Sequence, residues 1–244
     1  VHSAPGHGKE DFDAGTKAGL PAVSPVKLNG EMTAEAGKYA GKKCREVDQE
    51  IVADLEAENA LVYRHPYTHD YPLCWRCKSP LLMLSVEQWF FRVSGIQRRM
   101  IELNKSVNWI PSWMLGRMHN WLEGIGDWPI SRARYWGTPL PIWLCEKCGA
   151  RRVVGSIAEL KRLGKVKNVD VHKPGVDKVT FRCKCSGVMR RVPDVLDVWF
   201  DSGVSSWAAL RFPRNTRLFK RFWPADINLE GTDQFRGWWN SQLI

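Results

Sequence analysis

The sequence predicts an α/β fold, and three observations support that prediction. Residues 226–229 have the pattern of a short strand, and apolar residues at helical spacing follow directly. The apolar segment DVLDVWF, which comes after Pro193, is typical of another strand. With 44% hydrophobic and 25% charged residues over 244 positions, the composition is that of a globular protein and excludes a disordered or collagen-like chain.

Charge and hydropathy narrow the class of protein further. The 36 Lys and Arg residues exceed the 26 Asp and Glu residues by ten, which favours a polyanionic partner such as nucleic acid, although such a surplus also occurs without one. No apolar run approaches the roughly 20 residues of a membrane-spanning helix, and the first residues lack the features of a secretory signal. We therefore expect a cytoplasmic protein with no membrane partner.

The first 60 residues predict loops and two helices. Residues 1–25 are rich in Gly, Ala and Pro and indicate loop and a short helix. Residues 46–60 place apolar side chains at helical spacing among acids, which indicates a surface helix.

Eight tryptophans are interleaved with arginines between Tyr71 and Trp143. Such a mixture can stack on and neutralise single-stranded nucleic acid, but Trp is also a large core residue, and we favour core packing. The tryptophans are Trp75, Trp89, Trp109, Trp113, Trp121, Trp128, Trp136 and Trp143.

Six of the seven cysteines form pairs, in the segments CWRC, CEKCG and CKC. A CxxC turn directs two thiolates at one ion, and tetrahedral Zn²⁺ requires four ligands. We predict one closed, structural zinc site formed by Cys145, Cys148, Cys183 and Cys185. Disulfides or a redox CxxC are the less favoured alternatives, because no secretory signal is evident.

The remaining pair, Cys74 and Cys77, is predicted to be half of a second zinc site. Its other two ligands are then absent or lie outside this chain.

The segment LEGTDQFRGWW gathers polar side chains at the predicted strand end. Glu230 lies where the strand over 226–229 ends, and Thr232 or Asp233 can cap the following helix. The carboxyl ends of strands are where α/β sheets bind ligands, and carboxylates there suit an ammonium group or a ribose. Equally, Asp233 is explained as a helix cap alone.

Five segments taken together resemble a known family. VHSAPGHGKEDF, CWRC, ISRARYWGTPLPIW, DVLDVWFDSGVSSW and EGTDQFRGWW occur in this order along the whole chain and resemble the class I aminoacyl-tRNA synthetases. Within that class, the pairing of WFDSG with EGTDQFRGWW is similar to the isoleucyl family and not to the valyl or leucyl families. The paired cysteines resemble its archaeal and eukaryotic-like branch.

The resemblance implies an internal fragment of a longer, monomeric chain, with part of a Rossmann-like catalytic domain, a zinc-ribbon insertion and the end of a β-rich editing domain. Val1 without a preceding Met, and an uncapped helical pattern at the other end, are consistent with such a fragment. The HIGH motif would then lie upstream and the KMSKS motif downstream. The implied parts are the end of the editing (connective polypeptide) domain in 1–68, a catalytic-domain return segment with the zinc half-site in 69–143, the zinc-binding insertion in 144–193 and a Rossmann-like catalytic segment in 194–244.

The implied activity is aminoacylation. ATP with Mg²⁺ would activate isoleucine to the adenylate, and the amino acid would then be transferred to tRNA. By resemblance, Glu230, Asp233 and Gln234 bind the aminoacyl-adenylate, whereas Trp199 and Trp238 form walls of the isoleucine side-chain pocket. Apolar rings suit a branched alkyl chain, and carboxylates suit its ammonium group.

An editing reaction is implied as well, because a missing methylene is worth only about 1–3 kcal/mol; isoleucine against valine is the standard worked case of this limit. By resemblance, Asp11 holds the ammonium group of misattached valine and His2 belongs to the same pocket. His7, Gly6 and Gly8 shape the turn between them. The hydrolytic site is incomplete in this chain, so the fragment alone is expected to be inactive.

Two departures from the family pattern occur. Ala133 stands where the family's ISRQRYWG motif has glutamine, so Arg132, Arg134 and Trp136 are candidates only for RNA or active-site contacts. CKC replaces the more usual CxxCG turn.

Two other interpretations remain open. A non-catalytic zinc-ribbon module that binds nucleic acid would explain the cysteines and the charge, but not Glu230 and Asp233. A valyl- or leucyl-tRNA synthetase relative would differ in the amino acid that it activates.

Overall fold

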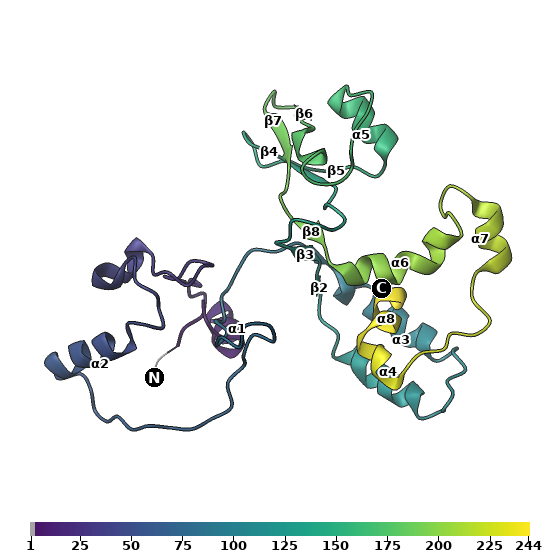
Figure 1. Cartoon of the computed structure of the whole chain (residues 1–244). Coiled ribbons are helices and arrows are strands. Elements are labelled where there is room, and N and C mark those ends of the chain that lie inside the picture. Colours follow the sequence, from purple (N-terminus) through teal and green to yellow (C-terminus); the bar gives the residue numbers. More distant parts are fainter. Residues whose placement is uncertain (1–2) are drawn as a thin grey trace. The chain divides into compact units, whose positions relative to one another are not determined.

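The computed structural model describes residues 3–244, which fall into two compact units that divide between Glu87 and Gln88 (Figure 1). His2, a candidate editing residue, lies outside the described residues. None of the described helices combines the length and apolar character needed to cross a lipid bilayer.

The first unit contains short helices joined by long loops. The helix expected within residues 1–25 is α1 (Lys9–Lys17), and that expected within 46–60 is α2 (Asp48–Ala57), which buries none of its residues. The 3₁₀ turn η1 (Ala34–Tyr39) lies between them. A β-rich segment was expected here, but the described part of this unit has only isolated bridges, because its extended segments have no strand partners.

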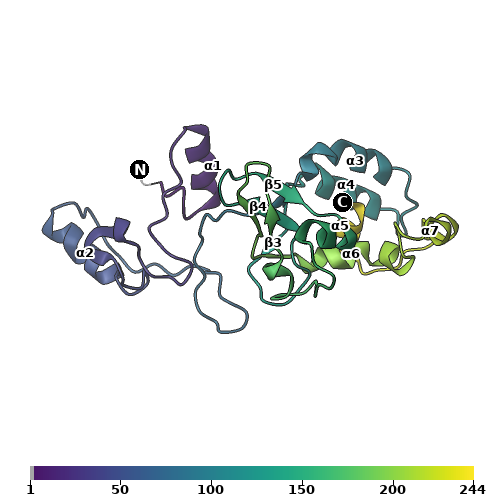
Figure 2. The ribbon, with the colours of Figure 1, turned by 90° about the horizontal axis from the view of Figure 1, so that it is seen from above.

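Two helices contribute most of one hydrophobic core of the second unit. In α3 (Gln97–Asn104) and α4 (Met114–Glu123), which lie side by side (Figure 2), methionine and leucine side chains face inward at helical spacing. The ribbon of β1 (Phe90–Phe91) and β2 (Trp128–Pro129), with the turn η2 (Val93–Gly95), flanks them. The buried members of this core are Val93, Met100, Met114, Met118, Leu122 and Phe235.

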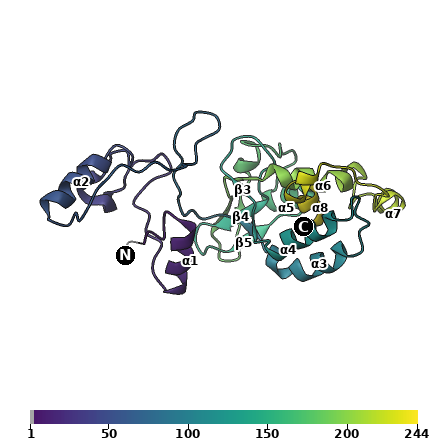
Figure 3. The same cartoon turned by 90° about the horizontal axis from the view of Figure 1, so that it is seen from below.

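The antiparallel pair of β3 (Ser131–Arg132) and β8 (Val195–Leu196) leads into α6 (Val198–Ala209). Then follow α7 (Thr216–Phe222), η4 (Thr232–Arg236) and α8 (Trp238–Leu243). Figure 3 shows α8 beside α6. A Cβ added at Gly203 on α6 would lie 2.7 Å from the carbonyl oxygen of Ser241, so only glycine permits this approach.

A four-stranded antiparallel sheet occupies the segment predicted as an insertion. Its order is β5-β4-β7-β6. The strands are β4 (Ile142–Cys145), β5 (Arg151–Val153), β6 (Phe181–Arg182) and β7 (Val188–Arg191), and α5 (Ile157–Gly164) and η3 (Val176–Lys178) lie between β5 and β6. Trp143, 1% exposed, anchors the core and donates its indole N–H to the carbonyl of Val179.

Two strand predictions are wrong, and the structure gives the physical reasons. DVLDVWF forms a strand only over Val195–Leu196, because Asp197 caps a helix at that point. Residues 226–229 form no strand, and Ile227 is 84% and Leu229 89% exposed, because no described strand pairs with this segment. All sheets within residues 3–244 are antiparallel.

The tryptophans divide between the two explanations that the sequence left open. Trp143 is buried, and four others between residues 71 and 143 are partly buried in the second unit. Three are exposed: Trp75, Trp113 and Trp136. Core packing therefore accounts for most of them, and Trp136 is considered with the site below.

Candidate functional site

The structure brings together the four cysteines that the sequence predicted as metal ligands. The Cys145 and Cys185 sulfurs lie 3.4 Å apart, those of Cys148 and Cys183 lie 3.8 Å apart, and all four lie within 4.8 Å of one another. Four ligands at the Zn–S distance of about 2.3 Å would stand about 3.8 Å apart in a tetrahedron. The donor set thus fits a closed zinc site with no position for a substrate.

Local backbone turns present these sulfurs in pairs. In the first turn the Cys145 N–H donates to the Ala150 carbonyl and the Gly149 N–H donates to the Cys145 carbonyl, with Gly149 at φ +68°. The second turn is one residue shorter. There the Cys183 N–H donates to the Gly187 carbonyl, and Ser186 takes the left-handed position at φ +67°.

Sheet register then brings the two turns to the same end of the sheet. Strand β4 pairs with β7 through Cys145 opposite Met189, and β7 pairs with β6 through Phe181 opposite Met189. The turn after β4 and the turn between β6 and β7 are therefore neighbours. A Cβ at Gly187 would lie 2.7 Å from the Cys145 sulfur, so this glycine leaves room for the cluster.

The thiols in this cluster influence one another. Burial raises the pKa of Cys145, but hydrogen bonds from the backbone N–H groups of Cys148 and Lys147 outweigh it and lower the pKa to about 6. The backbone at Gly187 lowers the pKa of Cys185, yet the sulfurs of Cys148 and Cys145 outweigh that effect and raise it to about 12. Four thiolates at these distances would repel one another, and a divalent cation among them would offset that repulsion.

The Cys74–Cys77 turn repeats the first of these turns in the other unit. The Cys74 N–H donates to the Ser79 carbonyl, the Lys78 N–H donates to the Cys74 carbonyl, and Lys78 takes φ +58°. Hydrogen bonds to the Ser79 hydroxyl and backbone lower the pKa of Cys77 to about 7. Within residues 3–244 no further ligand lies close enough to complete a site there.

The proposed amino-acid pocket residues lie on two neighbouring helices. Trp199 is in the first turn of α6, and Trp238 begins α8 and donates its indole N–H to the Ser202 carbonyl of α6 at 2.8 Å. The structure thus packs together the two helices that carry these tryptophans, which are far apart in the sequence.

The acidic candidates lie just before α8, on an exposed segment. Glu230 and Asp233 are both exposed, and the side chain of Asp233 does not cap the helix η4. Instead, the Gln234 side-chain oxygen accepts the Trp238 N–H at 2.8 Å, which places this amide at the start of α8. The interpretation of Asp233 as a helix cap alone is therefore wrong, and its carboxylate is accessible to a ligand.

The loop of the RARYWG motif carries the candidate RNA contacts. Trp136 is 69% exposed, and its ring stacks on that of His172 from the insertion, with centroids 5.1 Å apart and planes at 3°. The Lys173 ammonium donates to the Arg134 carbonyl at 3.2 Å and to the Pro193 carbonyl at 2.6 Å. The insertion therefore contacts this loop directly.

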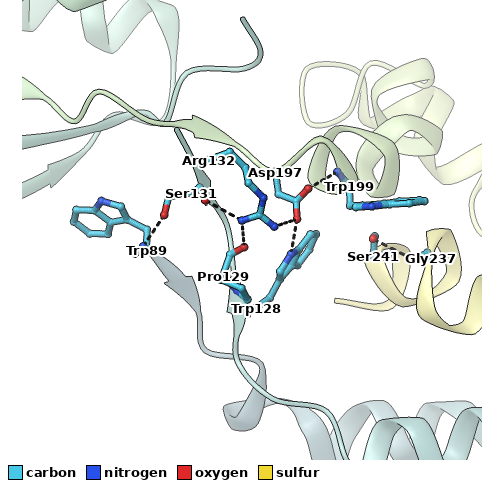
Figure 4. A network of polar contacts seen from close by, with 9 residues as sticks. All are labelled: Trp89, Trp128, Pro129, Ser131, Arg132, Asp197, Trp199, Gly237 and Ser241. Atoms are coloured by element: carbon cyan, nitrogen blue, oxygen red, sulfur yellow. Dashed lines mark hydrogen bonds and ion pairs between the residues drawn. The ribbon is translucent and has the colours of Figure 1, made fainter. Parts of the chain in front are cut away.

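The Arg132 side chain, which is 37% exposed, is directed toward the buried carboxylate of Asp197. Its guanidinium donates to Asp197 Oδ2 at 2.6 Å and to the carbonyls of Pro129 and Ser131 (Figure 4).

Asp11, the described editing candidate, closes the turn that precedes α1. Its carboxylate accepts the Ala4 N–H at 3.1 Å and the Ser3 hydroxyl at 3.3 Å. Gly6 must be glycine, because a Cβ there would lie 2.1 Å from the Val23 carbonyl oxygen. The His7 ring bonds to the Met83 carbonyl at 3.0 Å, which ties this turn to the loop that contains Met83.

Comparison with known proteins identifies the family. Residues 30–244 match the family described as tRNA synthetases class I (I, L, M and V). The chain belongs to this family. The resemblance to class I synthetases is thereby confirmed.

Curated relatives point to one member of the family. The chain is 49% identical over 245 residues to a protein of Methanosarcina barkeri, and 48% identical to proteins of Methanothermobacter thermautotrophicus and Archaeoglobus fulgidus; each is described as isoleucine–tRNA ligase. Each alignment covers all of this chain, but the chain spans only about a quarter of the relatives' length, 23–24%. The expected similarity to isoleucyl enzymes is confirmed.

A solved structure of a LeuRS–tRNA–LeuAMS complex from Agrobacterium radiobacter K84 is also similar. It is 30% identical, with a TM-score of 0.31, and the match covers 46% of this chain and 15% of that one.

Sequence reasoning missed Asp197, the residue that joins α6 to strands β2 and β3. Asp197 accepts hydrogen bonds from Trp128, Arg132 and Trp199. The signal available was the acid one residue before the helix, which was instead assigned to a strand.

Proposed function

We propose that this chain carries part of the aminoacylation site of an isoleucine–tRNA ligase. In the reaction, isoleucine and ATP with Mg²⁺ form isoleucyl-adenylate and pyrophosphate, and the isoleucyl group then passes to tRNA. The observation that carries the proposal is the 48–49% identity to isoleucine–tRNA ligases along the entire chain.

The geometry supports a division of roles among the pocket residues. Trp199 and Trp238 supply apolar faces for the isoleucine side chain, and both belong to the packed pair α6 and α8. Glu230 and Asp233 lie on the segment that leads into α8, where their exposed carboxylates can hold the ammonium group and the ribose. Gln234 orients the start of α8 and faces the same ligand.

The test is isoleucine-dependent pyrophosphate exchange by the full-length protein. Glu230→Ala and Asp233→Ala should each reduce kcat/KM by about tenfold to a hundredfold, because each removes a charge-assisted hydrogen bond worth about 1.5–3 kcal/mol. Glu56→Ala, which changes an exposed acid on α2, is the control and should leave exchange unchanged. Survival of exchange in both variants would show that the adenylate assignment is wrong.

Zinc has a structural role in this proposal. Cys145, Cys148, Cys183 and Cys185 hold one ion, and the ion stabilises the insertion whose loop contacts the RARYWG motif. The ion would stabilise the folded insertion and take no part in catalysis, because four thiolates leave it no open coordination position. Cys74 and Cys77 are half of a second such site.

We also propose that tRNA contacts the loop between β3 and β4. Arg134 and Trp136 are exposed there, and a guanidinium and an indole suit phosphate and base stacking. Arg132 acts through Asp197.

Editing of valyl-tRNA is the second proposed activity, with Asp11 and His2 in the hydrolytic pocket. The geometry of Asp11 favours this role. Its carboxylate accepts hydrogen bonds from Ser3 and Ala4 and has lone pairs left to accept another from an ammonium group. In the full-length protein, Asp11→Ala should let valyl-tRNA accumulate and leave isoleucine activation near normal. Asp13→Ala is the matched control, because this half-exposed acid of α1 forms an ion pair with Lys9; unchanged deacylation in Asp11→Ala would refute the role.

A further inference from the structure

We propose that Asp197 is a positioning residue for the amino-acid pocket: its carboxylate fixes Trp199 and the RARYWG loop in one arrangement. This inference rests on the proposed function of Trp199 as a pocket wall, and it assigns a role to a residue outside the ligand contacts.

The carboxylate of Asp197 joins three segments of the second unit (Figure 4). Its Oδ2 accepts the Trp128 indole N–H at 3.0 Å and the Arg132 guanidinium at 2.6 Å, and its Oδ1 accepts the Trp199 backbone N–H at 3.1 Å. The side chain is only 7% exposed, so water competes little for these bonds. The donors are 69, 65 and 2 residues away in the sequence.

The backbone bond fixes the beginning of α6. Asp197 is the N-cap of this helix, and its carboxylate satisfies an N–H group that no helical carbonyl can reach. Trp199 is the residue that donates this N–H, so the same bond that starts the helix also fixes the backbone of the pocket wall. Figure 4 shows its indole pointing away from Asp197.

The RARYWG loop is tied to the same turn of α6 at both ends. Arg132 at the start of the loop binds Asp197, and Thr138 beyond its end donates a hydroxyl to Asp201, at 2.8 Å and 3.0 Å to the two carboxylate oxygens. Asp197 and Asp201 flank Trp199 in the sequence. A shift of the loop would therefore move the turn of α6 that carries Trp199, and a shift of that turn would move the loop.

Arg132 is held rigidly enough to transmit such a shift. Its guanidinium also donates to the Pro129 and Ser131 carbonyls, so it cannot follow a displaced carboxylate without losing those bonds. Trp128 is likewise packed against Phe91 at 6.0 Å between ring centroids.

The experiment measures pyrophosphate exchange by the full-length protein with Asp197→Asn, Arg132→Lys and Trp199→Ala. Asparagine keeps the shape of Asp197 but presents an N–H₂ group where one acceptor oxygen stood. Glu159→Gln is the matched control, because it breaks another partly buried Arg–carboxylate pair of the same unit, that with Arg152 at 2.5 Å, away from the pocket. The readouts are KM for isoleucine, KM for ATP, and the ratio of kcat/KM for isoleucine to that for valine.

A positioning role predicts a selective effect. Asp197→Asn should raise KM for isoleucine about tenfold or more and lower the isoleucine-to-valine ratio, with KM for ATP changed by less than about twofold, because a displacement of about 1 Å in an active site costs up to about a hundredfold. Arg132→Lys should move both quantities in the same direction by a smaller factor. Glu159→Gln should leave all three readouts unchanged.

Two results would overturn the proposal, and each is distinct from a failure of the proposed function. If Trp199→Ala raises KM for isoleucine but Asp197→Asn and Arg132→Lys do not, Asp197 has no positioning role. If Asp197→Asn lowers only the amount of folded enzyme and Arg132→Lys leaves the isoleucine-to-valine ratio unchanged, the role is structural alone. If Trp199→Ala itself leaves KM for isoleucine unchanged, the pocket assignment in the proposed function is wrong.

Discussion

The turns at Cys145–Cys148 and at Cys74–Cys77 have the same backbone hydrogen bonds, yet among the described residues only the first meets a second pair of cysteines. Each turn has a residue at positive φ in the same place, Gly149 in one and Lys78 in the other. The local sequence is therefore sufficient to point two sulfurs the same way. A complete ligand set needs a second turn, and the pairing of β4 with β7 brings one to the Cys145–Cys148 turn.

The largest expected effect is on metal content. The 244-residue chain should bind about one zinc ion, because one set of four thiolates is complete. Cys145→Ser should abolish that binding and unfold the four-stranded sheet, whereas Cys74→Ser should leave the zinc content unchanged. Elemental analysis under reducing conditions measures both. A second ion that is lost in Cys74→Ser would break the comparison, since it would mean that both turns are complete.

A smaller effect on zinc affinity is expected from Gly187→Ala. The added Cβ would lie 2.7 Å from the Cys145 sulfur and 3.2 Å from that of Cys185, so the cluster must open. We expect the dissociation constant for zinc to rise about tenfold to a hundredfold, as for other disturbances around a metal site. Competition with a chelator measures it. Gly126→Ala is the control, because its added Cβ would meet no atom within 4 Å and its backbone is not at positive φ, and an equal loss of affinity there would contradict this explanation.

The incomplete turn can be tested through the reactivity of Cys77. In zinc-free protein, alkylation of this exposed thiol should rise with pH around a midpoint of about 7, because the lowered pKa leaves about half of it as thiolate at neutral pH. Ser79→Ala should move the midpoint up, toward the ordinary value of roughly 8.5, and slow alkylation at pH 7 by roughly tenfold. Mass spectrometry of the labelled peptide measures the rate; an unchanged midpoint would show that Ser79 does not set the pKa.

The smallest effect concerns the residue at positive φ. Lys78→Gly should stabilise the first unit by up to about 1 kcal/mol, because glycine takes φ +58° without a Cβ penalty. The exchange Gly149→Lys should destabilise the second unit by a similar amount. Urea denaturation of the two variants measures the difference, and effects of the same sign would contradict the equivalence of the two turns.

Much of the site could be predicted from local sequence. The spacing of the cysteines identified all four members of the cluster, and the resemblance of five motifs identified the family. The strand over 226–229 could not be judged in this way, because a strand exists only where a second backbone pairs with it, and none of the described residues does so.

The amino-acid sequence by itself determined the cysteine turns, the helices α1 and α2 and the family, because each depends on residues close together in the chain or on motifs read in order. Only the tertiary structure showed that the pairing of β4 with β7 is what brings the turns at Cys145 and Cys183 together, and that Asp197 binds Arg132 and Trp128. Sheet register and the burial of one carboxylate bring together residues more than 30 positions apart, and no local pattern records such contacts.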